Sequence, residues 1–540
     1  MLDSTSIIVI NNVKMPINAS LKEAFSVARN RLAKLGVRAR TEDMYIYRRS
    51  VDARNKSEVK FVYSVAVSTA GLNIGEDKLF GEDISLIGSQ RFPDVVIGDT
   101  QLDAPPVIVG SGPAGLFAAL ILAENGYRPI VLERGGSVSE RKTMYERFVR
   151  EHILDKNTNI QFGAGGAGTF SDGKLVTRIN DPLSSYVLNR FCEFGADEAI
   201  KYLAKPHIGT DVLSVIVDSM LARIEELGGR VQYHTCFLSA NTRGGKVVSV
   251  FTDKGEIPAG ALILAIGHSA RDTYETLMSE SFKIEAKPFS VGMRIEHLAE
   301  DIDRAMYGDF AGNEKLGHAE YNLSYDTKNR GVYTFCMCPG GEVVAAASED
   351  GGVAVNGMSY NSRAGRNSNS AVLASIFCED FGSDPRKAIE LQRAIERAAY
   401  SSAGGGYAAP IVTVGDFLSD RATTEPGRIT PTYMNGNNVK VVSPSLYLPD
   451  VVTSSIKNAL GAFDKKIKGF AARDAVLTGA ETRTSAPLRI LRNNETRLAL
   501  GYDNLYPAGE GAGYAGGITS AAIDGLKSAL ALMKAYKPVR

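Results

Sequence analysis

The chain has 540 residues, of which 44% are hydrophobic and 23% charged, and these are ordinary values for a globular protein. This length exceeds what one hydrophobic core usually supports, so we expect about two to four domains. The 61 basic residues balance the 61 acidic residues, which excludes a protein whose whole surface is built to attract nucleic acid or an anionic membrane.

The N-terminus carries acid before a short apolar run and has no basic segment or small-residue cleavage site, so it does not read as a signal peptide. The longest apolar stretches, such as 261–266, are far shorter than the roughly 20 residues of a membrane helix. The five cysteines, an odd number, do not form a disulfide framework, and the histidines lack metal-ligand spacing. We therefore expect a cytoplasmic protein with no membrane partner and no metal.

Residues 1–95 are predicted to form a small α+β domain, for which a ferredoxin-like arrangement is one option. Strands are expected at 7–10, 45–47 and 59–67, and a helix at 20–35. The stretch 29–60 is rich in basic residues, including Arg48, Arg49 and Arg54. A solvated hairpin and helix face is the favoured interpretation, and a docking patch for nucleic acid or protein is the alternative.

A βαβ unit follows the proline linker at 102–106, with strand 107–109, helix 112–125 and strand 129–132. Gly110 permits a tight turn, Gly112 lets the backbone approach a pyrophosphate, and Gly115 lets the helix pack on the strand. An acidic residue ends the second strand roughly 20 residues further on, where it can accept ribose hydroxyls. This fingerprint predicts a bound adenine dinucleotide, held by Gly110, Ser111, Gly112, Pro113, Ala114, Gly115, Glu133 and Arg134.

The C-terminal string at 503–525, DNLYPAGEGAGYAGGITSAAIDG, resembles the second flavin signature of the glutathione-reductase-type superfamily. The resemblance implies that the dinucleotide is FAD, and that Glu510, where Asp is more frequent, binds the ribityl chain. It further implies that strand 231–237 lies under the adenine and that the apolar strand at 261–266 ends the crossover sheet. The residues it adds to the FAD site are Phe237, Gly267, Gly509, Glu510, Gly517 and Ile518.

Taken as a whole, the chain resembles the large bacterial flavoproteins described as FAD-dependent or NAD-utilising dehydrogenases. The resemblance covers nearly the full length and includes the strings QFGAGGAGTFSDGKL at 161–175, FCMCPGG at 335–341, NGMSY at 356–360 and ETRTS at 481–485. Ala164 departs from the acidic residue expected in the first string. The implied fold is α/β: a Rossmann-like FAD-binding domain at 103–274 and 491–540, interrupted by an inserted α+β substrate domain at 275–490.

The glycine-rich loop at 163–168 offers backbone N–H groups with little side-chain bulk, which suits contact with a flat ring or a phosphate. We place this loop and the polar residues after it at the flavin; a tight structural loop is the alternative. The residues are Gly166, Gly168, Thr169, Ser171, Asp172, Gly173 and Lys174.

Four residues are candidates for catalysis: Lys174, Cys336, Cys338 and Arg483. The two cysteines point to one face if they lie on a strand, where they would form a redox pair or supply a thiolate; buried thiols that act as small hydrophobes are the favoured alternative. Arg483 would face the flavin or hold a substrate carboxylate, with a structural salt bridge as the alternative.

These features predict an FAD-dependent oxidoreductase that transfers a hydride or an electron pair at flavin N5 to or from a small molecule. No second complete strand–GxGxxG–helix unit is present, so NAD(P)H is expected only as a transient donor. Two alternatives stay open: a flavoprotein that docks to RNA or protein through its basic N-terminal domain, and a non-catalytic FAD-binding redox sensor.

Overall fold

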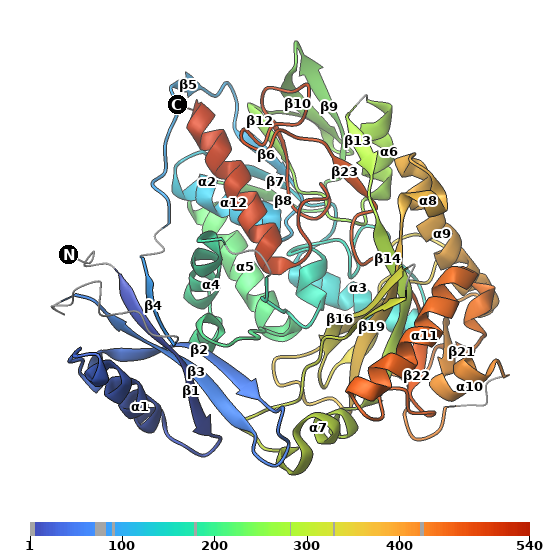
Figure 1. Cartoon of the computed structure of the whole chain (residues 1–540). Coiled ribbons are helices and arrows are strands. Elements are labelled where there is room, and N and C mark those ends of the chain that lie inside the picture. The colour runs from blue at the N-terminus through green and yellow to red at the C-terminus, as the bar shows by residue number, and fades with distance from the viewer. Residues whose placement is uncertain are drawn as a thin grey trace. The chain divides into compact units, whose positions relative to one another are not determined.

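The computed structural model describes residues 6–70, 83–88, 92–177, 181–280, 282–327, 330–421 and 426–539. The chain divides into two compact units (Figure 1). The first comprises Met1–Pro93, Asn180–His207 and Glu300–Ala319, and the second comprises Asp94–Ile179, Ile208–Ala299 and Glu320–Arg540. The first unit thus takes in two later segments in addition to the predicted domain at 1–95.

The first unit is built on a four-stranded antiparallel sheet in the order β2-β3-β1-β4, with helix α1 packed on one face. The helix begins after Ser20, which forms a capping box with Glu23, and buries Ala24, Ala28 and Leu32 at four-residue spacing. Its elements are β1 (Ile7–Pro16), α1 (Leu21–Lys34), β2 (Met44–Asp52), β3 (Lys60–Ser68), β4 (Ile84–Ile87), α4 (Leu183–Glu193) and most of α7 (Ala299–Tyr307).

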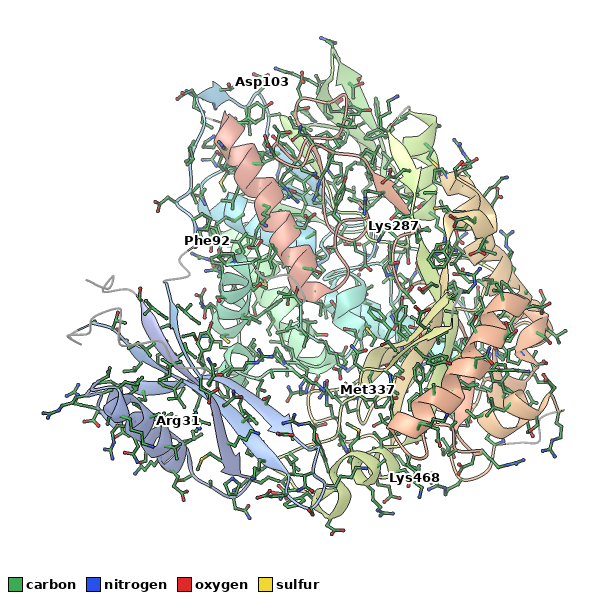
Figure 2. All side chains as sticks on the ribbon, viewed as in Figure 1. Arg31, Phe92, Asp103, Lys287, Met337 and Lys468 are labelled. Carbon is green, nitrogen blue, oxygen red and sulfur yellow. The ribbon has the colours of Figure 1, made fainter. Side chains whose placement is uncertain are left out.

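Much of the basic character of the first unit is neutralised inside it. Arg54 pairs with Asp52 at 2.6 Å, and Arg31 on α1, labelled in Figure 2, donates to the Asn11 carbonyl at 2.8 Å. The guanidinium of Arg49 lies 5.2 Å from the ring centre of Phe61 within the unit. Across its three segments the unit carries as many acidic as basic residues. The first unit is therefore balanced in charge as a whole, and docking through the basic stretch at 29–60 stays a prediction.

The second unit contains a five-stranded parallel sheet in the order β24-β12-β6-β7-β8. Helices α2 and α12 pack together, and α2 also packs on α5. The bounds are β6 (Pro106–Val109), α2 (Pro113–Glu124), β7 (Ile130–Leu132), α5 (Thr210–Glu226), β8 (Arg230–Gln232), β12 (Ala261–Leu264), β24 (Leu505–Pro507) and α12 (Ile518–Ala535).

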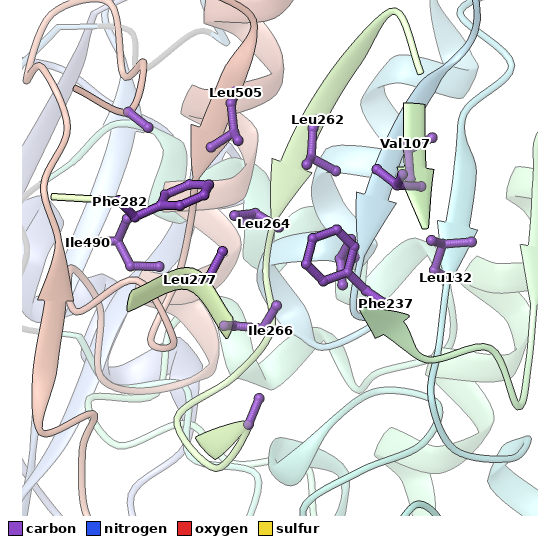
Figure 3. Close-up of a cluster of buried hydrophobic side chains, with 14 of the residues drawn as sticks. Val107, Leu132, Phe237, Leu262, Leu264, Ile266, Leu277, Phe282, Ile490 and Leu505 are labelled. Carbon is purple, nitrogen blue, oxygen red and sulfur yellow. The ribbon is translucent and has the colours of Figure 1, made fainter. Parts of the chain in front are cut away.

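Alternate residues of the parallel strands face a hydrophobic core opposite these helices (Figure 3). Val107 and Val109 of β6 belong to this core, whereas Ile108 between them lies against α2. A small antiparallel sheet and helix α6 complete the core with residues such as Phe237 and Leu277. Their bounds are β9 (Phe237–Arg243), β10 (Lys246–Thr252), β11 (Gly255–Pro258) and α6 (Arg271–Ser279).

The expected strand at 231–237 is wrong as a single element. Strand β8 ends at Gln232, the chain turns at His234 with a φ of 52°, and β9 begins at Phe237 in a different sheet. Phe237 pairs with Thr252 of β10 in that second sheet, and its side chain is buried in the core.

A seven-stranded sheet in the order β15-β16-β19-β14-β22-β20-β21 occupies the region predicted as an inserted domain. Helix α11 (Asp450–Lys466) packs on it, and the hairpin of β17 (Glu342–Ala345) and β18 (Val355–Met358) contacts β14, β16, β19 and β22. The strands are β14 (Phe289–Leu298), β15 (Ser324–Thr327), β16 (Arg330–Cys338), β19 (Asn367–Ile376), β20 (Ala409–Thr413), β21 (Val439–Val441) and β22 (Val476–Glu481).

Shorter elements connect these sheets. They are β5 (Thr100–Gln101), α3 (Val138–Glu151), β13 (Ile284–Ala286), α8 (Cys378–Phe381), α9 (Pro385–Ser402), α10 (Val414–Ser419), β23 (Leu488–Ile490) and β25 (Tyr536–Lys537). None of the helices in the described ranges has the length and apolar character needed to cross a membrane.

Candidate functional site

One large cavity opens at the carboxyl ends of the parallel strands, entirely within the second unit. Its empty volume is about 1500 Å³, including the solvent at its mouth. The ends of β6, β7 and β12, the start of α2 and the start of α12 border one side, and residues of β16, β18 and β22 border the other. Ligands of open parallel sheets bind at this kind of position.

The glycine fingerprint folds as a turn that side chains would block. Gly110 has a φ of 97°, and a Cβ on Gly115 would lie 1.9 Å from the Gly110 carbonyl oxygen. Helix α2 begins immediately after Gly112 with Pro113 at its first turn, so its free N–H groups border the cavity. A Cβ on Gly166 would come within 2.9 Å of the Gly112 Cα, so the two glycine loops lie against each other.

The carboxylate of Glu133 joins these two loops through hydrogen bonds. One carboxylate oxygen accepts from the Ser111 backbone N–H at 3.1 Å and from the Ser111 hydroxyl at 2.5 Å. The other accepts from the Gly135 N–H at 3.0 Å and the Gly163 N–H at 2.9 Å. A carboxylate has about four lone-pair sites, so the chain itself occupies them. Ribose binding by Glu133 therefore stays a prediction, and the contacts give this side chain a positioning role.

The segment 163–175, which includes the glycine-rich loop, is tied to α12 at the cavity and to α5 behind it. Thr519 in the first turn of α12 donates to the Leu175 carbonyl at 2.8 Å, and Thr210 at the start of α5 donates to the Thr169 carbonyl at 2.6 Å. Arg141 donates to the carbonyls of Ala164 and Gly166 at 2.5 and 3.0 Å. The loop is therefore held at the cavity by backbone carbonyls, and Ala164 supplies one of them.

Glu510 follows β24 and places a carboxyl group in the cavity. Burial raises its pKa to about 7, and the nearby ammonium of Lys287 only partly offsets this. Lys287 follows β13 in the sequence and is labelled in Figure 2. Among the described residues its side chain accepts no hydrogen bond from the protein. The residue is partly exposed at the cavity, and an acceptor without protein donors suits a ligand that brings hydroxyl donors.

Most predicted site residues meet at this cavity, although some lie behind its wall. The residues that line it are Gly110, Gly112, Pro113, Ala114, Glu133, Arg134, Gly166, Gly168, Ser171, Asp172, Lys174, Phe237, Gly267, Cys336, Arg483, Glu510, Gly517 and Ile518. Those behind the wall are Ser111, Gly115, Thr169, Gly173, Cys338 and Gly509. Gly509 is needed for packing, because a Cβ there would lie 2.7 Å from the Ala114 Cβ.

The polar residues after the glycine loop form a chain of ion pairs. Asp172 binds the Arg363 guanidinium at 2.5 Å, and Arg363 also binds Glu320 at 2.6 Å. The Lys174 ammonium lies 3.4 Å from the second oxygen of Glu320. The charge of Asp172 is thus balanced by Arg363. Of the two cations in this row of ion pairs, Lys174 lines the cavity.

The two cysteines do not share one face as a regular strand would place them. An irregularity in the pairing of β16 with β19 falls between Phe335 and Cys338, and Cys336 has a φ of 40°. As a result Cys336 lines the cavity whereas Cys338 does not. Burial raises the pKa of Cys336 to about 11 and that of Cys338 to about 12, so both are thiols at neutral pH. This opposes the thiolate role.

Arg483 is engaged in a buried ion cluster, which is the alternative foreseen for it. Its guanidinium donates to both oxygens of Glu396, at 3.0 and 3.1 Å, and Arg271 donates to the same carboxylate at 2.8 Å. The neighbouring His268 is neutral, because burial, Arg483 and Arg271 lower its pKa to about 3. Arg483 therefore lines the cavity as a paired cation and not as a free one.

Sequence reasoning gave no role to a buried pair on the opposite wall. Arg294 of β14 is fully buried and donates to Glu481, the last residue of β22, at 3.0 Å. The two are 187 residues apart in sequence. The available signal was an arginine in the mostly apolar run at 289–295, since buried charges are rare unless they are paired. Phe335, Asn356 and Thr484 are further lining residues that were not predicted.

The residues of this cavity fit an FAD molecule. Two helix N-termini and the glycine cradle of Gly112 and Gly166 suit a pyrophosphate, and Glu510 offers an acceptor without a protein donor. Within the described residues, no group of three His, Cys, Asp or Glu side chains is placed to hold a metal ion.

Family comparisons agree with this reading of the cavity. Residues 103–158 match the FAD binding domain, residues 288–484 match the family described as FAD-dependent protein, C-terminal domain-like, and residues 7–68 match a domain of unknown function. The chain is also similar to the L-amino acid deaminase of Proteus vulgaris, with 14% identity, coverage of 83% and 98% of the two chains and a TM-score of 0.33. The glycine oxidase of Bacillus cereus is 10% identical to this chain, with coverage of 79% of this chain and 94% of the oxidase and a TM-score of 0.31.

A much closer relative comes from Clostridium beijerinckii, in a protein described as uncharacterized. The two sequences are 44% identical over 526 residues, which is 96% of this chain and 97% of the relative. This chain therefore belongs to the same family as the Clostridium beijerinckii protein, and it is a flavoprotein with an FAD-binding domain at residues 103–158.

Proposed function

We propose that this flavoprotein is an oxidoreductase that moves a hydride or an electron pair between FAD and a small molecule bound in the same cavity. One observation carries the proposal. The elements that suit FAD and a second set of polar side chains, from the seven-stranded sheet and the β17–β18 hairpin, border one continuous space. Bound FAD would supply the two-electron chemistry, and the protein would supply position and polarity.

Several side chains that line the cavity support a chemical role. Lys174, Asn356 and Glu481 place a cation, an amide and a carboxyl group around the cavity, and Phe335 adds an aromatic surface. A pocket with an apolar lining and a few convergent polar groups is typical of a small-molecule site. NADH or NADPH would approach this space transiently, because the sequence has one complete strand–GxGxxG–helix unit and the flavin uses it.

The test is anaerobic reduction of the holoprotein in a stopped-flow cuvette. NADH, NADPH and a panel of amines, 2-hydroxy acids and dithiols are each mixed with the oxidised protein, and the flavin absorbance is followed. We expect at least one donor to bleach the flavin well above the buffer rate and an added acceptor to restore it. Bleaching by none of them, in protein that dithionite reduces fully, would contradict an oxidoreductase role.

A further inference from the structure

Glu481 stands where the seven-stranded sheet meets the cavity. It is the last residue of β22, which pairs with β14 on one side and β20 on the other. Its side chain is 4% exposed and lines the cavity together with Asn356 and Cys336. The carboxyl group is therefore fixed by a rigid strand at the wall opposite the FAD-binding elements.

The hydrogen bonds of Arg294 show how little of the Glu481 charge is compensated. The Arg294 Nε donates to Asn369 at 2.8 Å, and Nη2 donates to the Cys336 carbonyl and contacts the Cys338 sulfur at 3.8 Å. Nη1 donates to Asn356 at 3.2 Å and lies 3.0 Å from both Glu481 oxygens. A guanidinium has five N–H groups. Four are used elsewhere, so Glu481 receives one shared N–H in place of a two-pronged fork.

This arrangement leaves Glu481 able to exchange a proton near neutral pH. Burial outweighs the single Arg294 contact and raises the pKa of Glu481 to about 7. An acid or base works best when its pKa lies near the working pH. Charged or titratable groups around the pair are the Cys336 and Cys338 thiols, with Asp172, Lys174 and Tyr321 beyond them.

Of the other carboxyl groups that line the cavity, two are bound by the protein and the third lies beside the elements that suit the cofactor. Glu133 accepts from four donors, which belong to Ser111, Gly135 and Gly163. Asp172 is bound by Arg363 and Ser359. Glu510 adjoins the start of α12, among the elements that suit the cofactor. Glu481 is thus the carboxyl group of the opposite wall whose remaining lone pairs are open to a ligand.

We propose that Glu481 is the acid–base catalyst of the cavity and that the substrate bears a hydroxyl or an amine on the carbon that is oxidised. This inference rests on the proposed oxidoreductase function. The C–H bond breaks and its hydrogen leaves with the electron pair to oxidised FAD. The O–H or N–H bond breaks, its proton passes to a Glu481 carboxylate oxygen, and its electron pair forms the C=O or C=N bond. The substrate loses two electrons, the flavin gains two, and Glu481 later releases the proton to water.

Asn356 supports this substrate class. Its Oδ1 accepts from Arg294 and from the Gly357 N–H at 2.8 Å, which fixes the amide beside Glu481. Its Nδ2 donates to no described residue of the chain. A substrate oxygen that accepts from Nδ2 would lie next to the carboxylate that removes its proton.

The decisive experiment measures the flavin midpoint potential of holoprotein against pH, with redox dyes, in the wild type, Glu481→Gln and Glu481→Asp. Reduction adds negative charge to the cavity, so a coupled carboxyl group takes up a proton. We expect the potential to fall more steeply with pH above about pH 7 in the wild type than in Glu481→Gln. Glu481→Asp should restore the steeper slope. Glu342→Gln, a raised-pKa carboxyl that does not line the cavity, should match the wild type.

Bleaching kinetics then test the substrate class. Glu481→Gln should slow bleaching by an amine or a 2-hydroxy acid about 100-fold or more at pH 8, while NADH and dithionite, which need no base, act as before. Equal pH slopes in wild type and Glu481→Gln with full flavin content would overturn the role of Glu481. Bleaching confined to dithiols or NADH would overturn the substrate class. Both results can be told apart from a third outcome, in which no donor bleaches the flavin. That outcome would contradict the proposed oxidoreductase function itself.

Discussion

The carboxylate of Glu133 allows a quantitative test of how the cavity is held together. It accepts two hydrogen bonds at each oxygen, from Ser111 on one side and from Gly135 and Gly163 on the other. Glu133→Gln keeps the shape but replaces one oxygen with an NH₂ group, so two donors lose their acceptor. A buried unsatisfied donor costs about 1–3 kcal/mol, so the free energy of unfolding should fall by roughly 2–6 kcal/mol.

FAD affinity should fall as well, because Glu133 sets the spacing of the two glycine loops. We expect the Kd for FAD, measured by quenching of flavin fluorescence, to rise more than tenfold, which corresponds to about 1.4 kcal/mol. Urea unfolding of the flavin-free protein measures the stability term separately. The matched control is Glu140→Gln, an exposed capping-box residue where Gln serves equally well. If Glu133→Gln has an unfolding free energy and an FAD affinity that are both within about 0.5 kcal/mol of the wild type, Glu133 does not hold the two loops together.

Three further predictions follow from the same cavity. Gly166→Ala should weaken FAD binding more than tenfold and destabilise the fold by about 1–3 kcal/mol, because a Cβ would strike the facing glycine loop at 2.9 Å, whereas Gly126→Ala, with open space around it, should leave FAD affinity unchanged in the same titration. FAD should bind about fivefold tighter at pH 8 than at pH 6, because an ionised acceptor makes stronger hydrogen bonds, and Glu510→Gln should abolish this difference in pH-resolved titrations. Cys336 should react slowly with iodoacetamide at pH 7, as followed by mass spectrometry, because its pKa is raised to about 11; alkylation within minutes would contradict the thiol state.

The stability of the flavin-free protein should also depend on pH through Glu510 and Glu481. Their folded-state pKa values of about 7 exceed the ordinary value of 4.5, so the folded state binds more protons than the unfolded state between these pH values. Stability is therefore fully present below about pH 4.5 and is lost as pH rises through 7, by on the order of 3 kcal/mol for each group. Thermal unfolding from pH 5 to 8 measures this. If the melting temperature of Glu510→Gln depends on pH as steeply as that of the wild type, this prediction is contradicted.

Local sequence rules predicted the parts of the fold whose causes are local. Helix α2 was expected at 112–125 and is observed at Pro113–Glu124, because glycine and proline fix its start. Helix α1 was expected at 20–35 and is observed at Leu21–Lys34, because Ser20 and Glu23 cap it. The strand expected at 231–237 was wrong as one element, because the chain turns at His234 and Phe237 begins a strand of a second sheet.

The side chains that determine the chemistry were less predictable, because their partners are distant in sequence. The sequence around Arg483 does not reveal its partner, because Glu396 lies 87 residues away and reaches it only in the folded chain. The role of Glu481 depends on how Arg294 divides its N–H groups among strands β16, β18, β19 and β22, and no spacing rule encodes that division. The glycine fingerprint, by contrast, needs no distant partner and was recognisable from the sequence.

The most direct test of the central claim is the flavin content of the purified, folded protein. After denaturation, the released cofactor is identified by chromatography and its amount is compared with the protein concentration. We predict one FAD per chain, either as isolated or after incubation with FAD. Folded protein that stays colourless and takes up no FAD would contradict the account.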